Sequence, residues 1–152
     1  MADDIREELT ESFADSEYRH AYAASFLNTS IAAQIKALRD ARNWTQEELG
    51  SRAGMRQESI CRLENVNYSG WSINSLRRLA EAFDLALVVK FESFGNLLQD
   101  IVSLNKETLI RPSFADDPAF QEREQQAPSA GDKLAQVYFP GNPINSRLRI
   151  AK

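Results

Sequence analysis

Apolar side chains recur at intervals of three or four residues along most of the chain, the spacing that gathers them on one face of a helix. Tyr18, Tyr22 and Phe26 form the first such group, and Asp15 or Ser16 can cap the helix that carries them. Later groups predict helices over residues 31–42, 46–53, 57–65, 73–83 and 94–104. The chain is therefore expected to be predominantly helical.

Polar residues and glycines mark where these helices begin and end. Thr45 and Glu48 have the spacing of a capping box, in which each side chain accepts a hydrogen bond from the backbone N–H of the other residue. Gly54 can adopt a positive φ and end that helix, and Ser72 can cap the helix that follows it. A third cap, in residues 28–30, predicts a break between the first helix and the second.

Residues 85–91 depart from the helical period, because apolar side chains occupy alternate positions there. This alternation predicts one β-strand. A lone strand leaves its backbone unpaired, so we expect this strand and the helix after it to form a homodimer with the same segment of a second copy. The residues assigned to the dimer interface are Leu85, Leu87, Val88, Val89, Phe91, Phe94 and Leu98.

The sequence divides into four parts around one core, since 152 residues rarely hold two complete cores. The parts are an acidic N-terminal arm with a helix (residues 1–27), a helical domain (28–84), a strand and helix for dimerisation (85–114) and a flexible tail (115–152). Prolines and polar runs distinguish the tail from the rest of the chain.

Charge is unevenly distributed among these parts. The net charge of −4 argues, taken alone, against a nucleic-acid partner. The N-terminal arm holds 2 basic and 7 acidic residues, however, so the remainder of the chain is close to neutral. Arginines recur near the predicted helix ends of the middle segment, where they can either contact phosphate or form solvated helix faces.

The chain has few of the residue types that enzymes and metalloproteins use. Cys61 and His20 are the only residues of their kind, too few for a structural zinc site or a nucleophile with a histidine base. The glycines are scattered singly, without a phosphate-binding loop. The longest apolar run has five residues, where a membrane span needs about twenty. We therefore expect a cytoplasmic protein without enzymatic activity, cofactor, metal or membrane partner.

The helices over residues 46–53 and 57–65 have the pattern of a helix-turn-helix, whose second helix lies in the major groove of DNA. Gly50 suits the point where the two helices touch. The side chains expected to face inward are Leu49, Ala53, Met55, Ile60 and Leu63. Those expected to face outward are Arg56, Gln57, Glu58, Cys61 and Arg62. Arginine and glutamine in such places can read guanine and adenine edges bidentately.

Five short elements follow one another in register along the middle of the chain. They are Ile35-Lys-Ala-Leu-Arg39, Trp44-Thr-Gln-Glu-Glu-Leu49, Ala53-Gly-Met, Ser59-Ile-Cys-Arg-Leu-Glu-Asn65 and Leu76-Arg-Arg-Leu-Ala80. Together they resemble the Xre/Cro-type helix-turn-helix regulators, which include the lambdoid phage repressors. The resemblance covers residues 31–84. It implies an all-α, lambda repressor-like domain of about five helices, with a helical arm before it and one β-strand and a helix after it.

The resemblance also implies roles for individual residues. Gln57 corresponds to a glutamine that contacts adenine, Gln46 to one that packs against it and touches phosphate, and Asn65 to a phosphate contact. Arg39 and Glu64 match a partly buried salt bridge that ties the first helix of the domain to the third.

Four charged residues complete the expected DNA contacts. Arg56 stands where many of the resembling regulators have a serine or threonine cap, so a phosphate or base contact is expected for it. Arg62 lies about one turn further on, within reach of base or phosphate, and Arg42 is expected to contact phosphate. Glu58 either accepts a hydrogen bond from cytosine or merely occupies a helix N-terminus.

These features predict a sequence-specific, dimeric regulator of transcription, a repressor that reads a double-stranded DNA operator with the third helix of its domain. Two alternatives stay open: an antitoxin that binds a toxin and regulates its own operon, and a protein-interaction module that uses the same helices without DNA. Copurification of a small basic partner would favour the antitoxin. Binding that does not respond to salt would favour the interaction module.

Overall fold

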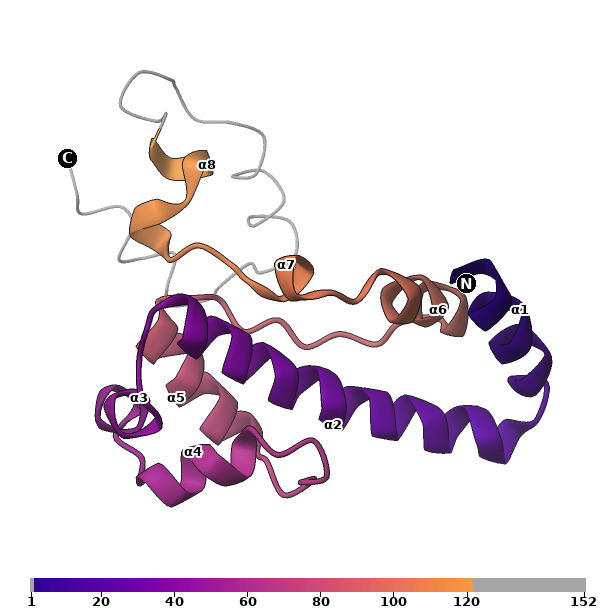
Figure 1. Ribbon diagram of the computed structural model, residues 1–152, viewed down its shortest axis with the longest axis horizontal. Helices are drawn as coiled ribbons and strands as arrows, with labels where there is room; N and C mark the ends of the chain where they lie inside the picture. Colours follow the sequence, from indigo (N-terminus) through magenta and orange to yellow (C-terminus); the bar gives the residue numbers. More distant parts are fainter. Residues whose placement is uncertain (1, 122–152) are drawn as a thin grey trace, which may run out of the picture. The chain divides into compact units, whose positions relative to one another are not determined.

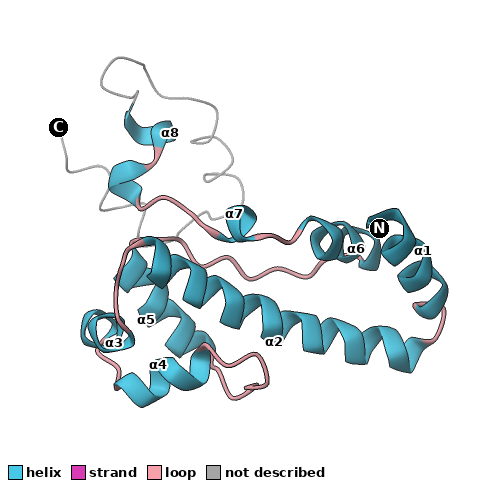
Figure 2. Ribbon diagram, in the orientation of Figure 1, coloured by secondary structure: helices cyan, strands magenta, loops and turns pink. Residues whose placement is uncertain are grey.

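The computed structural model describes residues 2–121, and every regular element among them is helical (Figure 2). The chain divides into two compact units, Met1–Asp116 and Asp117–Lys152. The elements of the first unit are α1 (Ala2–Ser12), α2 (Ser16–Ala41), α3 (Gln46–Ala53), α4 (Gln57–Leu63), α5 (Ile73–Phe83), α6 (Phe94–Ser103), α7 (Lys106–Leu109) and the 3₁₀ helix η1 (Phe114–Asp116) (Figure 1). The described part of the second unit holds α8 (Pro118–Gln121). The predicted all-α class is confirmed for this part of the chain, and the flexible tail expected over residues 115–152 lies outside it from residue 122 onward.

The arm and the first helix of the domain form one continuous helix, α2, so the break predicted at residues 28–30 is wrong. Asp15 caps this helix and accepts from the Tyr18 N–H at 3.0 Å. Asn28 instead accepts from the indole N–H of Trp71 at 3.0 Å, and the Ser30 hydroxyl donates to the Leu27 carbonyl at 3.0 Å. Because these polar side chains find partners outside a capping arrangement, the backbone continues through them as helix.

The predicted ends of α3 and α5 are confirmed. Thr45 and Glu48 form the capping box, with the Glu48 N–H donating to the Thr45 hydroxyl at 3.1 Å and the Thr45 N–H to the Glu48 carboxylate at 2.6 Å. The second of these bonds holds the pKa of Glu48 below its usual range. Gly54 ends α3 with φ +61°, and Ser72 caps α5 by accepting from the Ser75 N–H at 3.1 Å.

The hydrophobic core lies where α3, α4 and α5 meet the C-terminal half of α2 (Figure 1). Its buried members are Ile35, Leu38, Leu49, Ala53, Ile60, Leu63, Leu76, Leu79 and Phe83. Leu49 of α3 and Ile60 of α4 are 0% exposed. Trp44 covers this core beside α3, with its ring stacked on Phe83 at 5.9 Å between centroids. The two short helices α3 and α4 are therefore held by their apolar faces rather than by their own length.

The β-strand predicted over residues 85–91 is absent, and the segment is a loop among the described residues. Alternating apolar positions suit a strand, but a strand also needs a neighbour to pair with. The backbone of residues 86–91 makes no hydrogen bond to another described residue. Its apolar side chains are consequently left in solvent, with Val88, Val89 and Phe91 exposed by 74%, 68% and 106%.

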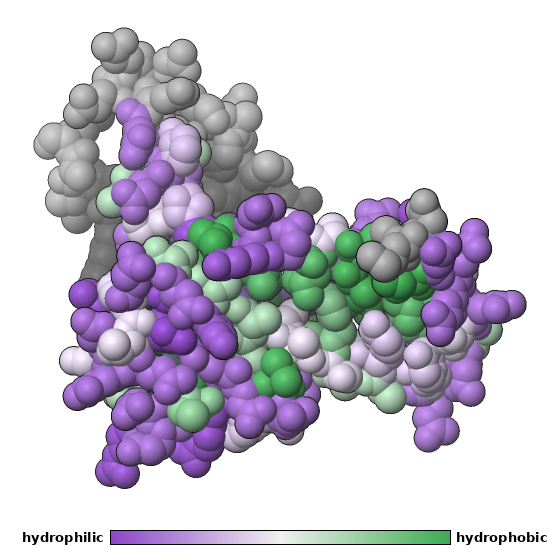
Figure 3. Space-filling model, in the orientation of Figure 1, coloured by the Kyte–Doolittle hydropathy of each residue, from purple (hydrophilic) through white to green (hydrophobic). Residues whose placement is uncertain are grey.

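A second apolar cluster joins α6 to α1 and to the start of α2. The ring of Phe13 lies 5.9 Å from that of Phe94 and 5.5 Å from that of Tyr22, and the His20 ring packs edge-on against Phe94 at 5.4 Å. Figure 3 shows the hydrophobic area that α6 and α1 present in this region. Phe94 was assigned to the dimer interface, but it packs within its own chain, because the acidic arm folds back to cover it. The N-terminal arm therefore packs against α6 of the same chain.

Residues 104–116 form a strap that runs back to the domain. The amide nitrogen of the Gln34 side chain donates to the Leu109 carbonyl at 3.2 Å, and the Phe114 N–H donates to the Asp84 carbonyl at 3.2 Å. The strap is thereby fastened to α2 and to the end of α5.

Candidate nucleic-acid interface

The outer face of α4 carries an exposed row of polar side chains. Ile60 and Leu63 are buried and fix the helix against the core. The outward residues are, as predicted, exposed: Arg56, Gln57, Glu58, Cys61 and Arg62. Figure 3 shows that the end of the domain formed by α3 and α4 is mostly hydrophilic. The arrangement therefore presents hydrogen-bonding groups outward on a helix that cannot rotate without uncovering its apolar face.

Arg56 precedes α4 and leaves it without a side-chain cap. The backbone of Arg56 is extended, and its side chain makes no capping hydrogen bond. Its exposed guanidinium group is consequently available at the N-terminal end of the helix, next to Gln57. Asn65, beyond the other end of α4, is exposed and its side chain accepts from the Asn67 N–H at 2.9 Å. Both side chains are therefore exposed, one before α4 and one after it.

Gly50 sets the close approach of α3 to the start of α4. The Met55 N–H donates to the Gly50 carbonyl at 2.7 Å. A Cβ atom added at Gly50 would lie 2.7 Å from the Met55 carbonyl oxygen, a backbone atom that cannot move aside without shifting the turn. The turn between the two helices therefore depends on the absence of a side chain at this position.

Arg78 of α5 holds the same turn from the other side. Its Nε donates to the Ala53 carbonyl at 3.0 Å, and a terminal guanidinium nitrogen donates to the Gly54 carbonyl. Both carbonyls end α3, where backbone acceptors lack helical partners and a positive charge is favoured. The sequence offered no signal for this role, because an arginine on the polar side of an amphipathic helix looks like a solvated residue.

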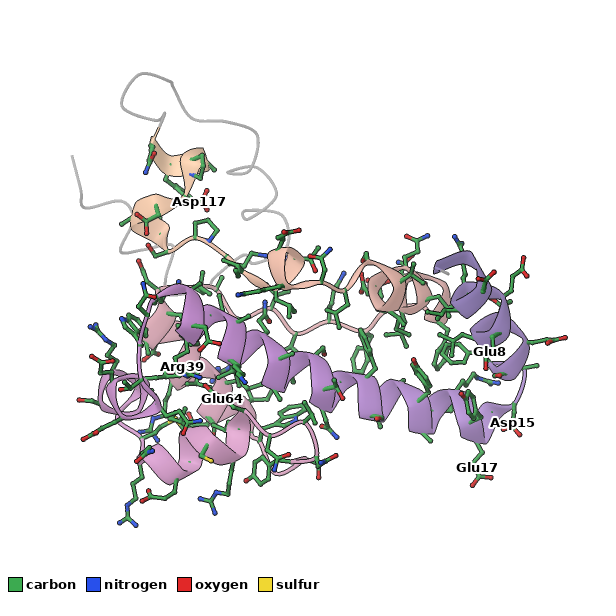
Figure 4. All side chains as sticks on the ribbon, in the orientation of Figure 1. Glu8, Asp15, Glu17, Arg39, Glu64 and Asp117 are labelled. Atoms are coloured by element: carbon green, nitrogen blue, oxygen red, sulfur yellow. The ribbon has the colours of Figure 1, made fainter. Side chains whose placement is uncertain are left out.

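Arg39 and Glu64 form the predicted salt bridge between α2 and the end of α4 (Figure 4). The Arg39 Nε lies 2.6 Å from one Glu64 carboxylate oxygen, and a terminal nitrogen lies 3.1 Å from the other. The same guanidinium group donates to the Trp44 carbonyl at 2.8 Å and lies 2.9 Å from the Asp40 carboxylate. The hydrogen bonds to Glu64 raise the pKa of Arg39 further. The two side chains are 13% and 5% exposed, so the bridge is nearly buried.

Gln46, at the start of α3, belongs to this cluster. Its side-chain amide donates to the second Glu64 oxygen at 2.9 Å. The resemblance implied that Gln46 packs against Gln57, whereas the hydrogen bond of the free protein goes to Glu64. One carboxylate therefore connects α2, α3 and the end of α4. Gln46 remains half-exposed, so its side chain stays accessible beside α4.

The side chain of Arg42, predicted to contact phosphate, forms hydrogen bonds within the protein. Its guanidinium group donates to the carbonyls of Leu38 at 3.1 Å, Phe83 at 3.0 Å and Arg111 at 3.5 Å. It also lies 5.1 Å from the centroid of the Phe83 ring. Burial lowers the pKa of Arg42. These contacts tie the end of α2 to α5 and to the strap, so the guanidinium group predicted to contact phosphate is engaged within the fold instead.

Among residues 2–121, no cluster of histidine, cysteine, aspartate or glutamate is suited to hold a metal ion. None of the helices described is both long and apolar enough to cross a lipid bilayer.

Comparison with known proteins agrees with this geometry. A family model described as a helix-turn-helix domain matches residues 13–92, which is more than half of the chain and contains all of α2, α3, α4 and α5. No curated protein and no solved structure matches the chain. The chain belongs to the family of helix-turn-helix domain proteins.

Proposed function

We propose that this protein is a sequence-specific transcriptional regulator of the Xre/Cro type, which binds double-stranded DNA with α4 in the major groove and represses the promoter that its operator overlaps. The observation that carries the proposal is the exposed polar face of α4 on a helix fixed by Ile60 and Leu63. A major groove about 12 Å wide admits one α-helix, and its floor offers donors and acceptors that these side chains can pair with.

The residue types on α4 suit both base and backbone contacts. Gln57 in the first turn can bind adenine through N6 and N7, and Arg62 can bind guanine through O6 and N7 or reach a phosphate. Arg56 and Asn65 flank the helix, where phosphate contacts set its position in the groove. Glu58 can accept from the amino group of cytosine and would oppose binding to phosphate, which adds to discrimination.

The Gln57→Ala variant is expected to weaken binding to the preferred site by about 1–3 kcal/mol while binding to random DNA is nearly unchanged, because only the base contact is lost. Duplexes selected from a randomised pool with the wild-type protein supply the preferred site, and gel-shift titrations give both affinities. Gln99→Ala, an exposed glutamine of α6, serves as the matched control. Equal losses on both DNAs would show that Gln57 does not read bases.

We propose further that the DNA-binding form is a homodimer built on residues 85–91. This segment exposes the apolar side chains Val88, Val89 and Phe91 in the single chain. Beside it, Ile73, Leu85, Leu87 and Val89 help to line a groove of about 400 Å³. Arg77 and Glu81 also line this groove, and such a pair of opposite charges can match its own copy across a two-fold axis. Two recognition helices are then available for half-sites one helical turn apart.

The Phe91→Asp variant is expected to weaken dimerisation at least about tenfold, which corresponds to about 1.4 kcal/mol. Because Phe91 is fully exposed in the single chain, the substitution should leave the fold intact. Sedimentation velocity over a range of concentrations measures the dimer dissociation constant, and Val66→Asp, an exposed apolar residue outside the segment, is the control. A wild-type protein that stays monomeric at high concentration would contradict the dimer.

A further inference from the structure

A pocket of about 520 Å³ lies between the end of α2, the end of α5, α3 and the strap. Arginines from three different elements line it: Arg42 from the end of α2, Arg52 from α3 and Arg111 from the strap. Its volume falls in the range of about 300–1,000 Å³ typical of small-molecule sites. The pocket is separate from the exposed face of α4, because none of its lining residues belongs to that helix.

The charges that line the pocket do not cancel. Burial lowers the pKa of Arg42, and the two carboxylates in the wall, Asp116 and Asp84, offset only part of that shift. The three carbonyl acceptors of Arg42 complete its environment. Three arginines face two carboxylates in the lining, which leaves one positive charge in excess. Neither Arg52 nor Arg111 forms an ion pair with a described residue, although Glu48, one turn before Arg52 on α3 and outside the lining, interacts with Arg52 electrostatically.

These two guanidinium groups also retain free donors. Arg52 stacks over the Trp44 ring at 4.2 Å from its centroid and makes no hydrogen bond to a described residue. Arg111 donates from one terminal nitrogen to the carbonyls of Thr108 at 2.6 Å and Ile110 at 2.9 Å, which leaves its other nitrogens available. A planar guanidinium group with free N–H donors is suited to bind a carboxylate bidentately.

Most of the remaining wall is apolar. Ser113 is its one uncharged polar residue, and the apolar residues are Ala41, Trp44, Ala82, Phe83 and Ile110. The Phe83 and Trp44 rings stack on each other, and Arg42 lies over Phe83, so these side chains pack against one another in the protein without a ligand. An inorganic anion gains no free energy from contact with this apolar surface, whereas the apolar part of an organic anion can bury it and bind more tightly.

We propose that this pocket binds a small organic carboxylate, whose charged group pairs with Arg52 and Arg111 and whose apolar body lies against Trp44, Phe83 and Ile110. The inference goes beyond DNA binding and does not depend on it, since the site can be tested on the free protein.

The test uses the two tryptophans of the chain as reporters. Trp44 lines the pocket, while Trp71 lies elsewhere with its indole N–H bonded to Asn28. The full chain, labelled with ¹⁵N, is titrated with benzoate and hexanoate, and each acid is compared with its neutral amide. We expect both carboxylates to shift the indole signal of Trp44 saturably and to leave that of Trp71 in place, while the amides have at least tenfold weaker effects.

One arginine variant and a matched control test whether Arg52 binds the carboxylate. Arg52→Gln is expected to weaken benzoate binding at least tenfold, and Arg6→Gln, an exposed arginine of α1 outside the pocket, is expected to leave it unchanged. Retained dispersion of the amide signals verifies that each variant is folded. The proposal is overturned if neither carboxylate shifts Trp44 saturably, if the amides bind equally well, if inorganic phosphate produces the same shift as benzoate, or if Arg52→Gln binds benzoate like the wild type.

Discussion

Replacement of Glu64 by glutamine is expected to lower the free energy of unfolding by about 3–5 kcal/mol, the usual cost of breaking a buried ion pair from one side. Glu64 accepts from Arg39 at 2.6 and 3.1 Å and from Gln46 at 2.9 Å, and its side chain is 5% exposed. The variant keeps the shape of the side chain but leaves the charge of Arg39 without its buried partner. The helices α2, α3 and α4 then lose the group that connects them.

Urea unfolding of the wild type and the variant measures this loss. Asp40→Asn provides the matched control, because Asp40 also contacts Arg39 at 2.9 Å but is 43% exposed. Its removal should cost no more than about 1 kcal/mol, as for other surface ion pairs. A double-mutant cycle with Arg39→Gln then isolates the interaction between Arg39 and Glu64. Strictly additive losses would mean that the two side chains contribute independently, and the central role of the bridge would have to be abandoned.

The Ile60→Ala variant should be the other strongly destabilised protein, with a loss of about 2–5 kcal/mol. Ile60 is 0% exposed and packs in the same core as Leu49 of α3 and Leu63. Truncation removes its transfer free energy and leaves a cavity that the neighbouring helices cannot fully close. Since α4 has seven residues and little stability of its own, its position depends on this side chain.

Thermal and urea unfolding measure the stability of the Ile60→Ala variant, and DNA titration measures its binding. Cys61→Ala, one residue further along the same helix, is the control, because Cys61 is exposed. It should change stability by less than about 0.5 kcal/mol. Ile60→Ala should lower affinity for preferred and random DNA together, in contrast to Gln57→Ala, because it disturbs the placement of α4 rather than one base contact. Wild-type stability in Ile60→Ala would refute the idea that this side chain anchors α4.

Local chemistry accounts for the features of the fold that could be predicted. The Thr45–Glu48 capping box, the positive φ of Gly54 and the cap at Ser72 each depend on residues within four positions of one another, so the sequence alone is enough to identify them. The same holds for the two faces of α4, because helical spacing assigns Ile60 inward and Gln57 outward.

Candidate functional residues were predictable where their role depends on the helix face they occupy, and not where it depends on distant partners. Spacing could not show that Arg42 donates to the Phe83 and Arg111 carbonyls, that Arg78 holds the turn after α3, or that Gln46 donates to Glu64. The pocket could not be predicted for the same reason, because two of its lining residues, Arg52 and Arg111, are 59 positions apart in the sequence.

Tertiary structure also decided the elements on either side of the core. The polar residues 28–30 have the composition of a cap, yet α2 runs through them because Asn28 bonds to Trp71 from another part of the chain. Residues 85–91 have the pattern of a strand, yet they form a loop because no described segment offers them hydrogen-bonding partners. In both places the local pattern allows two conformations of similar free energy, and the partners supplied by the rest of the fold select one of them.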